Sequence, residues 1–525
     1  MSEKIDSINK TPELYAVIDI GSTALRLMIA ELSVKGQLRT VDFLHQSVTL
    51  GRDTFTTGSI SSENISLCIE TLKNFRKIIS EYDIPEKRVR AVATTAVREA
   101  SNSDAFSDRV SISAGINIEI IDDIDTARLT YLSYKAGIGS SKTFKKKNVL
   151  ISEVSGGSSF VLYLEKGVVQ LADAYRLGSL RTYEMMEASG ISDSSLPRIT
   201  RDHIKRAMKR TVKRNNLGKV HTLIALGGDI RFAARKIAPE WNGTTPVKIR
   251  TSQIKKLAGE IMSLSVEDCM ERHKLCYTDA ESLSPALFSY YYLARNLGVS
   301  ELLAANMSMR HGLLLEMQEE KQIDYALIGQ IKRSLIEIGR KYSFDEKHAL
   351  FVAETAERIF NFLKEEYRLS GRAFTLLTAA AYLHDIGSFI SSKSHHKHSR
   401  YLIQNSDIFG LNKNDLLLVS LIARYHRKAA PKSSHRDFSM LARNDRMLVT
   451  KLASILRVAD ALDRSGTIRP GSIEFLPGED NLIILISSSG EPSLERIAVR
   501  EKGGLFSDVY GMELIIKTKQ ETGSK

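Results

Sequence analysis

The sequence predicts two α/β lobes, then an all-α domain, then a small α+β domain at the C-terminus. Three observations lead to this prediction. At 525 residues the chain exceeds the length that one hydrophobic core serves. An apolar–glycine–apolar pattern occurs twice in the first half, and helical periodicity dominates after about residue 325. The expected domains are the lobes at 1–133 and 134–322, the helical domain at 323–470 and the last domain at 471–525.

The first lobe is expected to open with a β-hairpin. Residues 15–30 (YAVIDIGSTALRLMIA) contain two apolar runs joined by a turn at Gly21 and Ser22. Helical patterns follow at 61–80 and 125–137, and strand-like runs at 88–93 and 117–121. Because strands alternate with helices, we expect an α/β domain.

The second lobe repeats the hairpin pattern. The segment VLISEVSGGSSFVLYLEKGVV carries an acid on a strand, turns through Gly156 and Gly157, and enters another strand. A third, weaker copy is LIALGGD at 223–229. The recurrence indicates two related halves.

After the two lobes, the alternation of strand-like and helical segments gives way to helical periodicity alone. Helical periodicity runs through 345–365, 372–384, 398–405, 413–427 and 445–463. From about Gly471 the strand-like runs LIILISS and MELIIKT predict a small α+β domain with a marginal core.

Composition indicates a soluble globular protein with a polyanionic partner. Hydrophobic residues make up 43% and charged residues 26% of the chain. The net charge is +12 and the isoelectric point is about 9.3, so polyanions are attracted over long range. The charge is concentrated at Lys142–Lys147 and in the helical pattern of Arg201–Arg214.

Signals for membrane insertion, secretion and cysteine-based sites are missing from the sequence. No apolar run reaches the roughly 18 residues that span a bilayer. The polar start MSEKIDSINKTPE does not resemble a signal peptide, so we expect a cytoplasmic protein. Cys68, Cys269 and Cys276 show no CxxC spacing, which argues against a disulfide framework or a cysteine-based zinc site.

The two glycine turns have the composition of phosphate-binding loops. Glycines allow close backbone approach, and successive N–H groups form a concave anion site. An acid just before each turn, Asp19 or Glu153, can hold Mg²⁺ through water. Two such loops facing each other would hold a phosphate between them. The expected phosphate-binding residues are Gly21, Ser22 and Thr23 in the first turn and Gly156, Gly157 and Ser158 in the second.

Three further side chains suit phosphate oxygens. The segment Ala93-Thr-Thr-Ala-Val-Arg98 follows a strand and offers the Thr95 hydroxyl and the Arg98 guanidinium. Arg26, on the second strand of the first hairpin, is another candidate. We therefore expect these three residues to bind phosphate.

These motifs occur in the order of a known family. The succession of DIGSTALRL, ATTAVREA, IEIIDDIDTARL, a Gly-Gly-Ser hairpin and RLGSLRTYE resembles the exopolyphosphatase/guanosine pentaphosphatase family over about residues 13–320. The helical domain extends the resemblance to roughly residue 470. The resemblance implies two lobes of the actin/hexokinase/Hsp70-like (RNase H-like) fold.

The resemblance also implies an activity. Members of this family remove terminal phosphate from polyphosphate or guanosine pentaphosphate with Mg²⁺, and related proteins are often homodimers. The expected ligand is therefore polyphosphate or guanosine pentaphosphate or tetraphosphate rather than nucleic acid or a membrane.

The sequence departs from the family pattern at the expected base. The family usually places two glutamates before Ala-Arg-Leu, and the second activates water. Here Asp125 and Thr126 occupy these positions, and threonine is not a useful general base near neutral pH. Asp122 and Asp123 are alternatives to Asp125. The family's Asp-x-Gly-Gly-Gly-Ser loop begins here with Glu153. The expected catalytic residues are thus Asp125, Glu153 and Asp19.

The helical domain carries a second candidate site. His384-Asp385 ends an apolar helical stretch, and the order H…HD…H…H…D resembles the HD phosphohydrolase superfamily. Imidazoles and carboxylates suit Mn²⁺ or Fe²⁺, and such a metal can generate hydroxide. The expected ligands are His348, His384, Asp385, His398, His426 and Asp460. His395 and His396 are alternatives to His398, because a sequence does not fix the face of a helix.

Three functional hypotheses follow. The first is a phosphohydrolase whose active site is the cleft between the lobes. The second is an HD-domain metallophosphohydrolase whose actin-like half senses nucleotide or polyphosphate. The third is a regulator that binds polyphosphate or an alarmone without hydrolysing it. The resemblance favours the first hypothesis, and Thr126 favours the other two.

Overall fold

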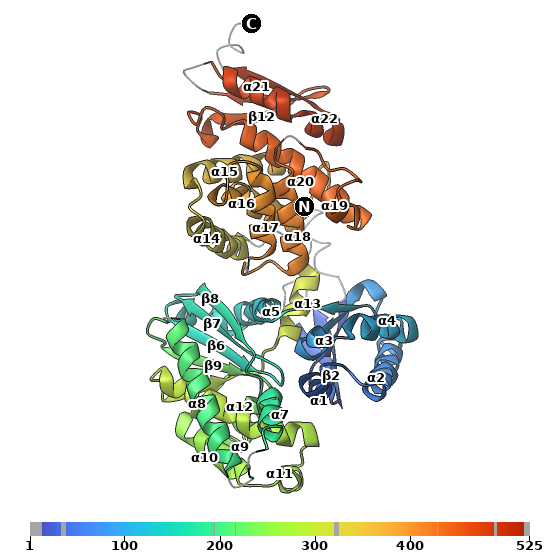
Figure 1. The fold of residues 1–525 in the computed structure, drawn as a ribbon, viewed down its shortest axis with the longest axis vertical. Coiled ribbons are helices and arrows are strands. Elements are labelled where there is room, and N and C mark those ends of the chain that lie inside the picture. The colour runs from blue at the N-terminus through green and yellow to red at the C-terminus, as the bar shows by residue number, and fades with distance from the viewer. Residues whose placement is uncertain are drawn as a thin grey trace, which may run out of the picture. The chain divides into compact units, whose positions relative to one another are not determined.

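The computed structural model describes residues 13–32, 38–190, 192, 195–215, 217–319, 325–406, 408–427, 429–487 and 491–518. The chain divides into two compact units, Met1–Gln318 and Glu319–Lys525, and each is described by itself (Figure 1). Within these described ranges, no helix combines the length and the apolar character needed to cross a membrane.

The first lobe contains a mixed five-stranded sheet in the order β3-β2-β1-β4-β5. β1 pairs antiparallel with β2 and parallel with β4, which places Asp19 opposite Arg26 on one side and Val92 on the other. The strands are β1 (Glu13–Ile20), β2 (Ala24–Leu32), β3 (Leu38–Ser47), β4 (Val89–Ala93) and β5 (Ile118–Ile120). The helices are α1 (Leu50–Thr57), α2 (Ser62–Glu81), α3 (Thr95–Glu99) and α4 (Ser103–Ala114).

The second lobe contains a six-stranded sheet in the order β10-β11-β9-β6-β7-β8. The strands are β6 (Val149–Val154), β7 (Ser159–Glu165), β8 (Val168–Tyr175), β9 (Thr222–Leu226), β10 (Val247–Arg250) and β11 (Glu301–Ala304). The longer helices are α7 (Ser179–Glu187), α8 (Leu196–Arg214), α9 (Gly228–Ile237), α10 (Thr251–Met262), α11 (Val266–His273) and α12 (Tyr277–Asn296). α5 (Asp123–Ala136) runs past the expected lobe boundary at 133 and packs against β7 and β8 (Figure 1).

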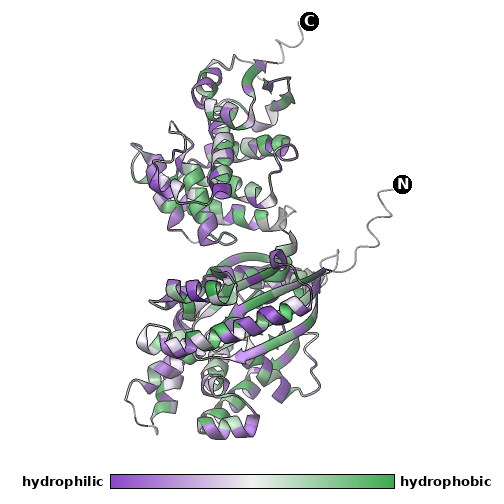
Figure 2. Ribbon diagram, turned by 90° about the vertical axis from the view of Figure 1, so that its right-hand side faces the viewer, coloured by the Kyte–Doolittle hydropathy of each residue, from purple (hydrophilic) through white to green (hydrophobic). Residues whose placement is uncertain are grey.

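Both predicted hairpins are present, and the third is wrong. β1–β2 and β6–β7 are antiparallel pairs around the glycine turns. At the third copy, Gly227 adopts a φ of 107°, and α9 begins at the next residue. The positive φ is accessible to glycine and redirects the chain into a helix, so β9 has no hairpin partner there. Along the helices, hydrophobic and hydrophilic residues recur side by side, as expected where one face is buried (Figure 2).

The helix α13 (Met309–Glu319) packs closely against α5 through a glycine. A Cβ atom built on Gly312 would lie 1.8 Å from the carbonyl oxygen of Leu129. No side chain fits at this position without moving one helix away from the other. Asp123, at the start of α5, and Arg310, at the start of α13, line the same cleft of the first unit.

Gly312→Ala is therefore expected to lower the free energy of unfolding by about 1–3 kcal/mol, because overpacking forces the two helices apart. The matched control is Gly259→Ala in α10, where an added Cβ meets nothing within 4 Å. That change should raise stability by about 0.5–1 kcal/mol, because alanine favours a helix interior. Urea denaturation of both variants checks the opposite signs, and an equal response would contradict the packing described.

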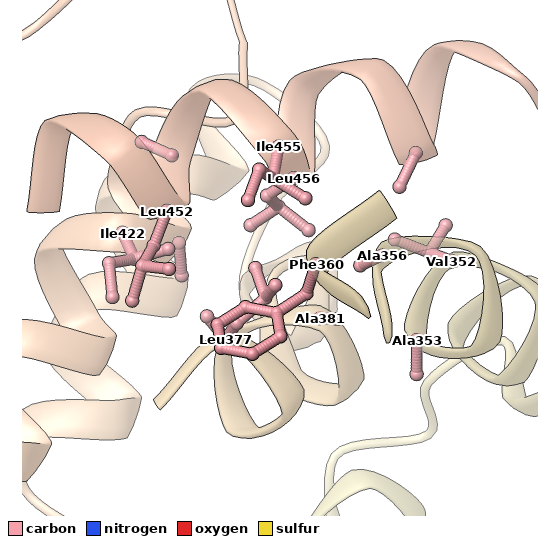
Figure 3. Close-up of a cluster of buried hydrophobic side chains, with 14 of the residues drawn as sticks. Val352, Ala353, Ala356, Phe360, Leu377, Ala381, Ile422, Leu452, Ile455 and Leu456 are labelled. Atoms are coloured by element: carbon pink, nitrogen blue, oxygen red, sulfur yellow. The ribbon is translucent and has the colours of Figure 1, made fainter. Parts of the chain in front are cut away.

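The second unit is a helical domain joined to a small sheet. Its helices are α14 (Tyr325–Lys341), α15 (Glu346–Leu363), α16 (Gly371–Leu383), α17 (His395–Gln404), α18 (Lys413–Arg424), α19 (Arg436–Ser439), α20 (Arg443–Ala461), α21 (Ser493–Lys502) and α22 (Gly504–Tyr510). Helices therefore occupy every segment predicted to be helical. Figure 3 shows the core between α15, α16, α18 and α20, with Phe360 beside Leu377 and beneath Leu456.

The C-terminal strands share this core. β12 (Ile473–Pro477), β13 (Asn481–Ile486) and β14 (Glu513–Thr518) form a sheet in the order β12-β13-β14. Ile473, Ile484 and Phe506 belong to the same buried cluster as the helices. The elements β12–β14, α21 and α22 are therefore stabilised by the helical core rather than by a separate marginal core.

Candidate functional site

A narrow cleft of about 120 Å³ lies between the two lobes of the first unit. The β1–β2 turn and the start of α3 line one side, and the β6–β7 turn lines the other. Most of the predicted residues meet here. Those lining the cleft are Asp19, Gly21, Ser22, Thr23, Arg26, Thr95, Glu153, Gly156 and Ser158.

The two glycine turns converge closely. A Cβ atom built on Gly156 would lie 3.2 Å from Cγ2 of Thr23 and 3.3 Å from Cβ of Ser22. Behind the second turn, a Cβ on Gly178 would lie 2.2 Å from the carbonyl oxygen of Gly156, so only glycine fits there. Gly157 packs against Thr95, and the described lining of the cleft does not include it. The turns thus form one pocket with backbone at its walls, as a phosphate site requires.

The two predicted acids, Asp19 and Glu153, both line this pocket, and their hydrogen bonding differs. Oδ2 of Asp19 accepts a hydrogen bond from Nη1 of Arg310 at 2.5 Å and lies 3.8 Å from Nη1 of Arg26. Oε2 of Glu153 is buried without a hydrogen-bond partner among the described residues. Burial, opposed by the charges of Arg231 and Arg310, raises the pKa of the Glu153 carboxyl.

Three guanidinium groups face these acids. Arg26, Arg231 and Arg310 all line the cleft. Burial and then the neighbouring Arg310 charge lower the pKa of Arg231 to about 10. Burial is also the first cause of the lowered pKa of Arg26. Guanidinium groups crowded to this extent are stabilised by an anion, and their fork geometry suits phosphate.

A hydroxyl–carboxylate network connects the lobes at one end of the cleft. Oγ of Ser158 lies 3.1 Å from Oγ1 of Thr95 and donates to Oδ1 of Asp123 at 2.8 Å. Nη2 of Arg98 donates to the other oxygen of Asp123 at 2.7 Å. Arg98 also donates to the carbonyl oxygen of Ile121 at 2.8 Å. Arg98 is not among the described residues that line the cleft, so it orients Asp123 rather than facing the ligand as predicted.

The expected base Asp125 does not reach the cleft, and this prediction is corrected. The residue is only 5% exposed and is absent from the described cleft lining. Its Oδ1 lies 3.3 Å from Nε of Arg128, and burial raises the pKa of its carboxyl to about 7. On a helix, successive side chains turn by about 100°, so Asp123 and Thr126 share the cleft face while Asp125 points away.

The cleft suits a hydrated divalent cation. Its donors are carboxylate oxygens, which Mg²⁺ prefers, and one of them, Oε2 of Glu153, is buried without a partner among the described residues. Two further acids, Asp229 and Asp279, line the same cleft. Burial, followed by the charge of Asp279, raises the pKa of Asp229 to about 8. A cation bound here would hold these carboxyls in their charged forms.

Sequence reasoning missed four charged residues of the cleft. Arg231 and Asp229 follow the Gly227-Gly228 corner, and the LIALGGD motif was the signal for them. Asp279 at the start of α12 and Arg310 at the start of α13 follow no motif of this kind. They reach the cleft through the packing of helices against the sheets, which a single sequence does not reveal.

Most of the histidines and aspartates predicted to bind metal in the second unit lie close together, in two groups. His348, His384 and Asp460 form one group, and Asp385, His395 and His426 form another; in each, the possible ligand atoms lie within 4.8 Å of one another.

His395, rather than His398, belongs to these groups, so the prediction for His398 is corrected and its stated alternative is the residue present. The two residues are three apart on α17, and only the first turn of this helix faces Asp385, with Nε2 of His395 3.0 Å from Oδ1 of Asp385.

A second cavity, in the second lobe, is lined by residues of the basic segment Arg201–Arg214. It has a volume of about 860 Å³ and is lined by β8, α7 and one face of α8. The residues of α8 that line it are His203, Ala207, Arg210, Thr211, Lys213 and Arg214, and all but Lys213 recur at helical spacing. At its edge, Nε of Arg181 donates to the carbonyl oxygen of Gly157 at 2.8 Å. The cavity therefore borders the second phosphate turn.

Comparison with known proteins gives matches over both units. Residues 29–321 match the Ppx/GppA phosphatase family, and residues 331–486 match Ppx/GppA phosphatase, domain III. A guanosine-5'-triphosphate,3'-diphosphate pyrophosphatase of Photobacterium profundum is 23% identical over 428 residues, 80% of this chain and 82% of that protein. The protein of the same name from Pseudoalteromonas translucida is 24% identical over 460 residues, 85% of this chain and 86% of that protein.

Among solved structures, an exopolyphosphatase from Cytophaga hutchinsonii has a TM-score of 0.51 at 20% identity. The match covers 58% of this chain and 97% of that one. At this identity the likeness extends to the fold alone.

Proposed function

The chain belongs to the Ppx/GppA phosphatase family, and on that premise we propose that its interlobe cleft hydrolyses phosphoric anhydride bonds. The proposed substrates are inorganic polyphosphate and guanosine pentaphosphate, from which the terminal phosphate is released. The observation that carries this proposal is the convergence of the two glycine turns beside three guanidinium groups that line the same cleft. Such a pocket matches the size and charge of a terminal phosphoryl group.

The proposed binding step uses groups on both lobes. Backbone N–H groups of the Gly21 and Gly156 turns and the hydroxyl of Ser22 donate to the phosphoryl oxygens, while the hydroxyl of Ser158 keeps its hydrogen bond to Asp123. Arg26, Arg231 and Arg310 offset the charge that the phosphates bring and that develops on the leaving oxygen.

The proposed attack step uses the carboxylate that α5 presents to the cleft. Asp123 accepts a proton from the attacking water, because Asp125 faces away and Thr126 is a poor base. The water oxygen forms a bond to phosphorus and the anhydride P–O bond breaks. The rest of the substrate, one phosphate shorter, is the leaving group. Arg98 and the hydroxyl of Ser158 hold the Asp123 carboxylate in place.

The proposed metal site lies at Glu153 and Asp19, with Asp229 on the same wall. Mg²⁺ bound there supplies neutralisation of phosphate charge and orientation of the terminal group. Oδ2 of Asp19 already accepts a hydrogen bond from Arg310, whereas Oε2 of Glu153 has no hydrogen-bond partner among the described residues. Glu153 is therefore the stronger ligand of the two.

A binding role without turnover is the alternative that one observation favours. Both oxygens of Asp123 are already engaged, Oδ2 by Arg98 and Oδ1 by the hydroxyl of Ser158, so neither is free to accept from an attacking water. A protein that binds polyphosphate or guanosine tetraphosphate but releases no phosphate would then act as a regulator.

Orthophosphate release from each substrate, with purified full-length chain and Mg²⁺, separates the two roles. We expect release, and a loss of about 10-fold in kcat/KM for Ser22→Ala and for Ser158→Ala, since each removes one hydrogen bond to a charged oxygen. The matched control, Ser66→Ala, changes an exposed hydroxyl on α2 and should leave kcat/KM unchanged. Salt-sensitive binding of polyphosphate with no release by the wild-type chain would support the regulator.

A further inference from the structure

A further cavity of the second lobe, with a volume of about 380 Å³, has no part in the proposed reaction. It is enclosed by α7, the start of α8, the end of α10, α11 and α12 (Figure 1). None of its described lining residues belongs to the interlobe cleft or to the basic cavity beside α8. Its volume lies in the range of pockets that hold small organic molecules.

Most of the lining of this cavity is apolar. Met186 comes from α7, Ile261 and Met262 from α10, and Leu264 from the loop that follows. Methionine side chains adapt their shape to what they contact. The lining therefore suits a ligand with a hydrocarbon body.

One buried carboxylate interrupts this apolar lining. The side chain of Glu281, on α12, has an exposed fraction of 0%, and its Oε1 has no hydrogen-bond partner among the described residues. Burial, opposed by the charge of Arg52, raises the pKa of the Glu281 carboxyl to about 7. Because a buried carboxylate oxygen without a donor is costly, the cavity favours a ligand that carries N–H or O–H groups.

The backbone of α12 adds a second acceptor at the same residue. This helix contains Pro285, four positions after Glu281, and both residues line the cavity. Proline has no N–H, so the carbonyl oxygen of Glu281 lacks its usual helical donor. Glu281 therefore offers two oxygen acceptors, one of them charged.

The charges around Glu281 are unbalanced. Arg52, on α1 of the first lobe, contacts Oε2 of Glu281, and its Nε donates to Oε1 of Glu184 at 2.8 Å. One guanidinium group thus serves two carboxylates. Glu187 also lines the cavity, and its described lining includes no lysine or arginine. The cavity therefore lacks positive charge, although the chain as a whole carries a net charge of +12.

We propose that this cavity binds a small organic cation, an alkylammonium ion. Its N–H groups donate to Oε1 and to the carbonyl oxygen of Glu281, and its hydrocarbon body packs against Met186, Ile261 and Met262. The ring of Tyr183, which also lines the cavity, adds a cation–π contact. The site is additional to the proposed cleft activity and does not rest on it.

Other partners of a carboxylate fit this cavity less well. A divalent metal ion needs several ligands, and no three metal-binding side chains converge here among the residues that the structure describes. An inorganic or organic anion meets two carboxylates. A single water supplies a donor but no charge, and it occupies only about 30 Å³. An ammonium group with a hydrocarbon chain satisfies the acceptor, the charge and the apolar lining together.

The test is ligand-observed NMR titration of the full-length chain, near neutral pH, with three probes that share one hydrocarbon body. They are hexylammonium, 1-hexanol and hexanoate, and sodium chloride is the blank for ionic strength. We expect hexylammonium to bind at least about 10-fold more tightly than hexanol, because its charge strengthens the hydrogen bond to the carboxylate. Hexanoate should not bind, since its charge is repelled by Glu281 and Glu187.

Two variants and a matched control place the ligand. Glu281→Gln keeps the size of the side chain but removes its charge, and it should weaken hexylammonium binding by about 10-fold or more. Val266→Phe keeps every charge but takes up part of the cavity, so both hexylammonium and hexanol should bind more weakly. Glu271→Gln changes an exposed carboxylate of α11 outside the cavity lining and should bind like wild type.

Equal affinity of hexylammonium for wild type and Glu281→Gln would overturn the proposal. Hexanoate binding as tightly as hexylammonium would also overturn it, as would the absence of any signal from wild type at about 10 mM hexylammonium. If Glu281→Gln does not fold, Val266→Phe decides, and wild-type affinity in that variant would place the ligand elsewhere. None of these measurements uses phosphate release from polyphosphate, which is the readout of the cleft.

Discussion

Asp123→Asn should lower kcat for phosphate release by about 10²–10⁴-fold, because it removes the general base from the cleft. Asparagine keeps the size of the side chain and its hydrogen bonds to Ser158 and Arg98 can partly persist, so KM should change little. The measurement is steady-state orthophosphate release with polyphosphate and with guanosine pentaphosphate at saturating Mg²⁺.

The control for this prediction is Asp125→Asn. Asp125 is buried beside Arg128 and faces away from the cleft, so kcat per folded molecule should stay within about threefold of wild type. Thr126→Glu, introduced into Asp123→Asn, places a carboxylate on the cleft face one helical turn later and should restore part of the rate. A large loss in Asp125→Asn with full activity in Asp123→Asn would reverse the assignment.

Glu153→Gln should reduce kcat/KM by about 1,000-fold, which corresponds to several kcal/mol of charge stabilisation lost with the metal. The carboxyl has its Oε2 buried without a hydrogen-bond partner among the described residues, and its pKa is raised chiefly by burial. A neutral amide binds the cation poorly, so raising the Mg²⁺ concentration should recover only a small part of the rate.

The matched control lies at the far end of the same hairpin. Glu165→Gln changes an exposed carboxylate at the end of β7 and should leave both the rate and its Mg²⁺ dependence as in wild type. Wild-type Mg²⁺ dependence in Glu153→Gln would exclude this carboxylate as the principal metal ligand and shift that role to Asp19 and Asp229.

The hairpins were predictable because their signal is local. Apolar residues on both sides of Gly21 and of Gly156-Gly157 specify strand, turn and strand within about twenty residues. The same reasoning failed at Gly227, where the strand is followed by a helix whose amphipathic pattern begins at Ile230. A glycine pair after a strand is compatible with both outcomes, and the residues beyond it decide.

The side chains that reach a site from a helix were predicted less well. Asp125 was misplaced by the phase of α5, where two positions change the face, and His398 by its place along α17, where only the first turn faces Asp385. Asp123 and His395 take the places expected for them. Arg310 was missed for a different reason: it enters the cleft through tertiary packing, and arginines are common on surfaces. A sequence alone provides no spacing rule that separates such arginines from solvated ones.

The most direct test concerns the two turns as one phosphate site. Tungstate is a tetrahedral oxyanion of phosphate type, and its anomalous scattering locates it in a crystal of the full chain. We expect one strong peak between the Ser22 and Ser158 turns, within hydrogen-bond distance of backbone N–H groups from both and near Arg310. A peak bound by one turn alone, or only in the basic cavity beside α8, would contradict a shared phosphate pocket.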